Sequence, residues 1–294
     1  MKKIITFLLL VFVCTISSIA QSSNFTEHPL NAQFILEDFE RFWKAFDEMD
    51  KTAKNPFDDY LKNASEGLSP LVHYFDSKML YQTVLERKAD YLKSRNVLDE
   101  LNGKEKKIKA AYAAMKYWYP KATFPPIYFA VGMFSSGGTV TENGLLIGTE
   151  LLADLNGLTG LAAHELIHFQ QNIQGEDNLL KQTLIEGSAD FIGELISGDH
   201  INMIAFKYGN KNATELAKEF VGIMKNTDYT DWLYGTSGKD NRPNDLGYWM
   251  GYKISEAYFE KQKDKQQAVH DILNIKAPFD FLKESGYLSK YIQE

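Results

Sequence analysis

Five consecutive residues, His164-Glu165-Leu166-Ile167-His168, constrain the fold of this chain more than any other feature. They fall inside an apolar helix that the hydrophobic period predicts over residues 159–174. Histidines four positions apart on a helix lie about 40° apart around the axis and ~6 Å apart along it, so both imidazoles can reach one metal ion. Glu165 is rotated by ~100° from His164 and can face the open side of that ion. The alternative is a hydrogen-bonded pair of core histidines on an ordinary helix.

The metal-site interpretation requires a third ligand on a second element. A catalytic zinc commonly has three protein ligands and one exchangeable water. Glu186 lies 18 residues beyond His168, on an apolar helix predicted over residues 178–197, and a turn at residues 175–177 lets this helix fold back beside the first. Gly187 would permit a close approach of the two helices at the metal. We therefore predict a zinc site formed by the two histidines and Glu186.

Other polar residues on the second helix or just after it complete this prediction or compete with it. Asp190 lies one turn after Glu186 and can accept the outer N–H of a metal-bound histidine, which fixes its tautomer. His200 and Glu194 are rival third ligands. A solvated helix face is the alternative for Glu186 and Asp190, although their neighbours are mostly apolar.

The start of the chain has the features of a secretory signal peptide over residues 1–20. Two lysines precede an apolar run over residues 4–13, and the small residues Ser18 and Ala20 occupy the −3 and −1 positions of a cleavage site. A membrane anchor is the alternative, but a span needs ~20 apolar residues. We expect an exported protein, periplasmic or extracellular, with no transmembrane span in the mature chain.

The only cysteine, Cys14, lies inside this segment. The mature chain would then contain no disulfide, so its stability must come from core packing and from a metal. Attachment of a lipid at Cys14 is the alternative, and it is disfavoured because such cysteines usually follow a small residue, whereas Val13 precedes this one.

The acidic charge balance of the chain disfavours two classes of binding partner, nucleic acids and anionic membrane surfaces. The chain carries 32 basic and 39 acidic residues, for a formal net charge of −7. A nucleic-acid-binding protein normally needs a basic face, and an anionic membrane surface attracts basic segments. We therefore expect a peptide or protein substrate and no nucleic acid, and the sequence leaves the oligomeric state open.

The remaining pattern predicts a mostly helical α+β fold. Helical periodicity covers residues 32–118, and strand-forming residues with turn signals follow over residues 127–147. Helices return after residue 159, and the last is predicted over residues 248–263. We divide the chain into a signal peptide (1–20), an N-terminal helical region (21–118) and a catalytic region (119–294).

The motif His164-Glu-Leu-Ile-His168, followed by Glu186-Gly-Ser-Ala-Asp190, resembles the gluzincin clan of zinc metallopeptidases. More narrowly, the chain resembles secreted bacterial predicted zinc-dependent proteases related to the gliding-motility lipoproteins. The narrower resemblance rests on residues 40–47, on the strand–turn–strand pattern and on residues 247–252. It implies a zincin-like fold with a small sheet and an N-terminal helical layer.

The resemblance also implies roles for further residues. In such enzymes an edge strand before the metal helix binds the substrate backbone, and residues 138–150 are the candidate here. A downstream tyrosine or histidine typically stabilises the oxyanion; the candidates are Tyr248 and Tyr252, for which core packing is the alternative. Arg242 is a candidate for binding a carboxylate of the substrate. The loop-borne histidine of some gluzincins has no match in this sequence.

Together these features predict a secreted zinc-dependent hydrolase, a peptidase in which Glu165 acts as general base on zinc-bound water. The alternative is a non-enzymatic component of the cell envelope that retains a metallopeptidase fold. An inactive relative often lacks the glutamate or a ligand, and here Glu165, both histidines and Glu186 are all present. A structural metal in a binding module fits less well, because such sites usually have four protein ligands, often cysteines.

Overall fold

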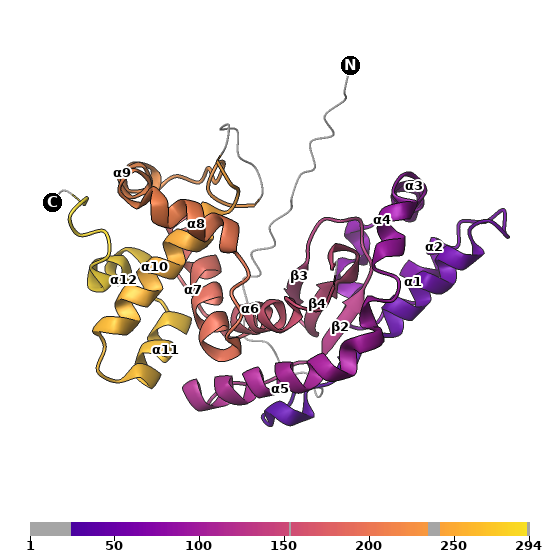
Figure 1. Ribbon diagram of the computed structural model, residues 1–294, viewed down its shortest axis with the longest axis horizontal. Helices are drawn as coiled ribbons and strands as arrows, with labels where there is room; N and C mark the ends of the chain where they lie inside the picture. The colour runs from indigo at the N-terminus through magenta and orange to yellow at the C-terminus, as the bar shows by residue number, and fades with distance from the viewer. Residues whose placement is uncertain (1–24, 153, 235–241, 293–294) are drawn as a thin grey trace, which may run out of the picture.

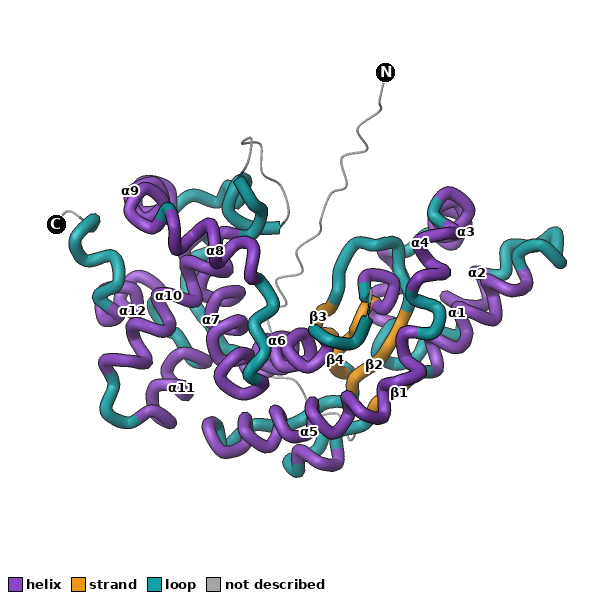
Figure 2. Tube along the Cα trace, in the orientation of Figure 1, coloured by secondary structure: helices purple, strands orange, loops and turns teal. Residues whose placement is uncertain are grey.

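A computed structural model of the protein describes residues 25–152, 154–234 and 242–292. The fold is α+β and mostly helical, as predicted, with one small sheet set between two groups of helices (Figures 1 and 2). The predicted signal peptide and Cys14 lie outside the described residues. In the described part of the chain, no helix combines the length and the apolar character needed to cross a membrane.

The sheet contains four strands in the order β1-β2-β4-β3. Strand β1 pairs parallel with β2, β2 pairs parallel with β4, and β3 pairs antiparallel with β4 at the edge of the sheet. The three strands predicted after residue 126 are confirmed, but β1 lies in a segment predicted to be helical. The bounds are Phe34–Ile35 for β1, Ile127–Ala130 for β2, Gly138–Thr141 for β3 and Gly144–Gly148 for β4.

Alternate residues of the central strands enter two separate apolar layers. Ile127 and Phe129 belong to the larger layer, which contains the helices after the sheet, whereas Tyr128 and Ala130 belong to the smaller one. This is the two-residue period of a strand buried on both faces. The helices of the smaller layer are α1 (Glu37–Glu48), α2 (Phe57–Lys62), α3 (Ser77–Glu86) and α4 (Lys88–Lys93).

Helix α5 (Leu101–Trp118) packs with the larger layer. Its buried residues Ile108, Tyr112 and Met115 face α6 and α7, and in Figure 1 the helix runs along the side of the molecule below the sheet. By packing, therefore, α5 groups with the helices after the sheet, although the sequence places it in the N-terminal region. The division at residue 119 stays a prediction about folding units.

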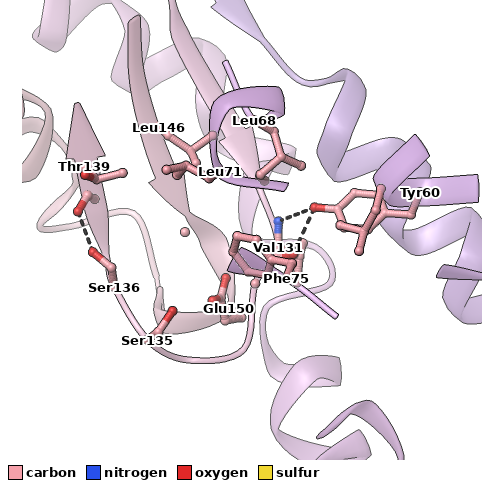
Figure 3. A pocket seen from close by; sticks show the side chains of 15 residues that line it. Tyr60, Leu68, Leu71, Phe75, Val131, Ser135, Ser136, Thr139, Leu146 and Glu150 are labelled. Carbon is pink, nitrogen blue, oxygen red and sulfur yellow. Dashed lines mark hydrogen bonds between the residues drawn. The ribbon is translucent and has the colours of Figure 1, made fainter. Parts of the chain in front are cut away.

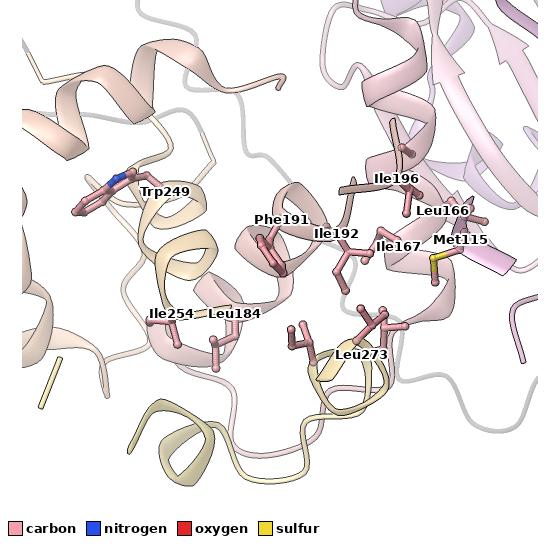
Figure 4. Close-up of a cluster of buried hydrophobic side chains, with 14 of the residues drawn as sticks. Met115, Leu166, Ile167, Leu184, Phe191, Ile192, Ile196, Trp249, Ile254 and Leu273 are labelled. Atoms are coloured by element: carbon pink, nitrogen blue, oxygen red, sulfur yellow. The ribbon is translucent and has the colours of Figure 1, made fainter. Parts of the chain in front are cut away.

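Helices α6 (Leu158–Gln170), α7 (Leu179–Ser197) and α10 (Leu246–Lys261) form the centre of the larger layer (Figure 4). Helix α7 ends where predicted, because Gly198 adopts a left-handed conformation with φ of 73°. Helix α6 ends four residues before the predicted position. There the backbone N–H of Asn172 donates to the carbonyl of Leu273, the last residue of α11. The N–H of Gln174 donates to the carbonyl of Ile275, just after that helix.

Several short helices complete the fold. The helix predicted over residues 248–263 is α10, but it is not the last: two more follow, and the sequence does signal them. The Asp264 side chain caps the first by accepting from the Gln267 N–H, and Pro278 begins the second. The remaining helices are α8 (Met203–Lys211), α9 (Ala213–Ile223), α11 (Lys265–Leu273), α12 (Pro278–Ser285) and the 3-10 helices η1 (Pro29–Asn31), η2 (Ser69–Tyr74), η3 (Val97–Glu100) and η4 (Thr149–Leu151).

Two glycines bring α7 and α10 into backbone contact. A Cβ on Gly187 would overlap the backbone of Gly251, and a Cβ on Gly251 would overlap the carbonyl oxygen of Thr183. The close approach predicted at Gly187 is thus made to α10 rather than to α6. Gly193 is the glycine of α7 that lies against α6: a Cβ there would lie 3.4 Å from the backbone nitrogen of His164.

This contact predicts a large cost for one added methyl group. Gly251→Ala is expected to lower the free energy of unfolding by about 3 kcal/mol, the upper end for overpacking, because the obstacle is backbone that cannot move aside. Gly103→Ala is the matched control: Gly103 is also in a helix but a Cβ there meets nothing within 4 Å. That variant should gain ~0.5–1 kcal/mol from helix propensity. Urea denaturation measures both, and equal stabilities would contradict the packing described.

Candidate metal centre

The two histidines of α6 and a glutamate of α7 converge on one point. His164 Nε2 and His168 Nε2 lie 2.9 Å apart, and Glu186 Oε2 lies 3.6 Å from the first and 3.3 Å from the second. His164 and Glu186 are buried and His168 is half-buried. In the described part of the chain, these three side chains form a group whose ligand atoms all lie within 4.8 Å of one another, close enough to hold one metal ion.

The outer nitrogens of both imidazoles have fixed partners. His164 Nδ1 lies 2.8 Å from Asp190 Oδ1, and His168 Nδ1 lies 2.9 Å from Gln171 Oε1. The amide nitrogen of Gln171 donates to the Ile185 carbonyl, which leaves its oxygen to accept from His168. Each Nδ1 therefore carries a proton, and each Nε2 is the nitrogen that can coordinate a metal ion.

This donor set fits a zinc ion. Two lone pairs 2.9 Å apart repel each other, and a cation between them and the Glu186 carboxylate removes the repulsion. Ligands of tetrahedral zinc at 2.0–2.1 Å lie roughly 3.3–3.4 Å from one another. The three separations, 2.9, 3.3 and 3.6 Å, bracket that value.

The electrostatic environment also favours positive charge at this point. Burial disfavours the charged form of Glu186, but His168 and His164 outweigh it and hold the pKa of the carboxyl well below its usual range. Burial lowers the pKa of His164, but hydrogen bonds to Asp190 and Glu186 outweigh it and raise this pKa well above its ordinary value. A cation bound here thus meets a Glu186 carboxylate that its surroundings already hold in the ionised form.

Glu165 lies beside the edge of the sheet. A Cβ built on Gly138 of β3 would be 2.5 Å from Glu165 Oε1, so only a glycine leaves room for this carboxylate. The side chain is buried, and burial raises the pKa of Glu165 against the opposing effect of His164 and His168. A carboxyl with a raised pKa, next to the metal ligands and an edge strand, is suited to the exchange of protons with a group bound there.

The two candidate tyrosines of α10 lie in different surroundings. The Tyr248 ring stacks on His164, with centroids 6.0 Å apart and planes at 17°. Tyr252 stacks on His200 at 5.9 Å, and His200 pairs with Glu194 at 3.9 Å. The structure therefore brings Tyr248 to the metal centre and places Tyr252 with the two rival ligands, which are not part of the cluster.

Arg242 is engaged elsewhere. Its Nη1 donates to both carboxylate oxygens of Glu219, at 2.9 and 3.0 Å, and its guanidinium lies 4.9 Å above the Trp232 ring. None of these groups belongs to the metal centre, so the structure does not bring Arg242 to the place where we expected it to bind substrate.

Three residues of the site were not predicted. The Tyr234 hydroxyl donates to Glu186 Oε1 at 3.2 Å, and the Asn202 amide donates to Asp190 Oδ2 at 2.6 Å. Gln171 holds His168, and its position three residues after that histidine was a usable signal. No periodicity marks the other two, because they lie in connections between helices, and Tyr234 has a left-handed φ of 62°.

Two histidines on one helix and a glutamate on the next, at the edge of a small sheet, form a donor set of the kind that zinc hydrolases use. A family model described as predicted Zn-dependent protease (DUF2268) matches residues 131–278, half of the chain, and the chain belongs to this family. The match includes the three residues of the centre, and it confirms the predicted zinc protease at the level of the family. No curated protein matches the chain.

Proposed function

We propose that the protein is a secreted zinc peptidase of the gluzincin type, with a zincin-like fold and with His164, His168 and Glu186 as the zinc ligands. The relation to the gliding-motility lipoproteins is part of the same proposal. The observation that carries it is the convergence of two Nε2 atoms and one carboxylate oxygen, with both outer nitrogens held by Asp190 and Gln171. The family to which the chain belongs supports the choice of peptide bonds as substrate.

When bound, zinc supplies a Lewis acid that polarises a carbonyl and lowers the pKa of water to about 7. Glu165 takes the proton of the attacking water and delivers it to the nitrogen of the departing amine. Its place against Gly138 sets the carboxylate beside β3, the edge strand. A substrate backbone that adds to β3 would therefore pass directly in front of Glu165.

The position of Tyr248 gives it the oxyanion role in this proposal. Burial and the nearby Glu186 raise the pKa of Tyr248, which keeps the hydroxyl protonated and able to donate. Tyr248→Phe should lower kcat by about 10²-fold, as loss of one oxyanion donor commonly does. Tyr252→Phe is the matched control and should turn over as wild type does. Steady-state kinetics at equal zinc content measures both; the role is refuted if Tyr248→Phe is as fast as wild type.

A cleavage assay on the zinc-loaded protein tests the function itself. A broad peptide library, analysed by mass spectrometry, should yield products that disappear when the metal is chelated and return when zinc is restored. A zinc-loaded protein that cleaves nothing would favour the non-enzymatic cell-envelope alternative.

A further inference from the structure

A small cavity lies under the edge strand, on the face of the sheet opposite α6. Its volume is about 90 Å³, and it lies between the sheet and η2, where leucines form much of its wall (Figure 3). A water needs ~10–15 Å³ of such space, so the cavity holds about six to nine water-sized groups, on the order of one long side chain. Its wall includes Leu68, Leu71, Ser135, Gly138, Leu146 and Glu150.

One oxygen of a carboxylate in this apolar wall, Oε2 of Glu150, lacks a hydrogen-bond partner. Glu150 is 6 % exposed; its Oε1 accepts from the Phe134 N–H at 3.1 Å, whereas its buried Oε2 accepts no hydrogen bond. Gly148 lies beside Oε2 and is also packed against the Ser136 carbonyl oxygen, which a Cβ at position 148 would overlap. An unpaired buried acceptor is unfavourable, and a donor that reaches it would remove this cost.

The side chains around Glu150 make no hydrogen bond to its Oε2. The Tyr60 and Tyr91 hydroxyls donate to backbone carbonyls of residues 131 and 132 at 2.9 and 2.7 Å. The cation that acts on Glu150 is Arg87, but its guanidinium lies 3.4 Å from the Phe134 ring centroid and it pairs with an aspartate of its own helix turn. Burial raises the pKa of Glu150, and a cation beside it would favour the ionised form.

The cavity is one strand away from the metal centre. Gly138 contacts Glu165 from the α6 side and also lines the cavity, and its neighbour Thr139 pairs with Leu146, which points into the cavity. Side chains of an added strand alternate between the two faces. A peptide beside β3 thus presents one residue to Glu165 and the next to the cavity face.

We infer, on the basis of the proposed peptidase function, that this cavity binds a lysine or arginine side chain of the substrate close to the bond that is cut. The alkyl stem packs against Leu68, Leu71 and Leu146, and the cationic head pairs with Glu150, which is the specificity-determining residue. An acidic side chain meets like charge there, and a short apolar one leaves Oε2 unpaired.

Peptide pairs that differ only in lysine against norleucine test this inference, at each position within two residues of the observed cleavage site. At one position wild type should prefer lysine by tenfold or more in kcat/KM. Glu150→Gln keeps an acceptor for Phe134 but should reduce the preference to less than twofold. Glu142→Gln, which removes the same charge from the exposed turn after β3, should keep it. Cleavage without a basic preference, or a preference that survives Glu150→Gln, overturns the specificity pocket and leaves the peptidase function standing.

Two further arms keep the outcome decisive. Ser135→Lys, at an exposed position on the cavity rim, should abolish the preference by supplying an internal lysine, and it replaces Glu150→Gln if that variant does not fold. If wild type cleaves nothing, binding decides: labelled alanine–glycine octapeptides with one central lysine or norleucine are titrated in fluorescence anisotropy. A lysine preference that depends on Glu150 supports the pocket, and equal binding overturns it.

Discussion

Glutamine in place of Glu165 is expected to lower kcat by about 10²–10⁴-fold while zinc content and Tm stay near those of wild type. The reason is that the amide has the shape of the carboxylate and fits the space left by Gly138, but it cannot take a proton. The ligand atoms of His164 and His168 are not altered. Steady-state cleavage of a confirmed peptide gives kcat, and elemental analysis and a thermal melt of the same samples give the zinc content and Tm.

Glu194→Gln is a suitable control for this experiment. Glu194 is also a glutamate of the larger layer, but it pairs with His200 and Tyr252 rather than with the metal centre. We expect turnover close to that of wild type. If Glu165→Gln retains near-normal turnover on a substrate that wild type cleaves, Glu165 is not the general base.

The second large effect concerns the metal. Wild type is expected to hold one zinc per chain, and His168→Ala should reduce this to well below one, because the remaining histidine and Glu186 make a site of two ligands. Binding to the folded state alone stabilises wild type by about 4 kcal/mol when free zinc is 1,000 times Kd. The variant should lose most of this increment, which a thermal melt with and without zinc measures.

A matched histidine variant separates this prediction from a general effect of removing imidazole. His200→Ala removes the rival ligand, which lies with Tyr252 and Glu194 outside the cluster. Its zinc content should stay at one per chain. Equal zinc in wild type and His168→Ala, or loss of zinc in His200→Ala instead, would contradict the ligand set.

The metal centre was predictable because all three proposed ligands lie on regular helices. A spacing of four puts His164 and His168 on one face, and the same spacing puts Asp190 above Glu186 on the next helix. The turn between the helices was marked by Gly175, which has a positive φ. Helical periodicity and turn residues, both local properties of the sequence, were therefore sufficient to predict the ligands and Asp190, the carboxylate that contacts His164.

Residues whose neighbours come from distant segments were not predictable in this way. Spacing put Tyr248 and Tyr252 on one side of a helix, but the packing of α10 along α7 sends one ring to His164 and the other to His200. Arg242 was chosen by residue type, and Glu219, 23 residues upstream, binds it. The position of Tyr234 depends on tertiary contacts that leave no pattern in the sequence.

The pairing of β1 with β2 has a consequence for how the chain acquires its structure during synthesis. Phe34 pairs with Ile127, and the smaller apolar layer is completed by Leu146 of β4. The ribosome therefore makes more than a hundred residues before the first strand meets its neighbour, and until then the aromatic side chains of α1 to α4 have only one another to pack against. The face of that layer which later covers the sheet stays exposed for several seconds at ordinary elongation rates, and exposed apolar surface of this kind is prone to aggregation.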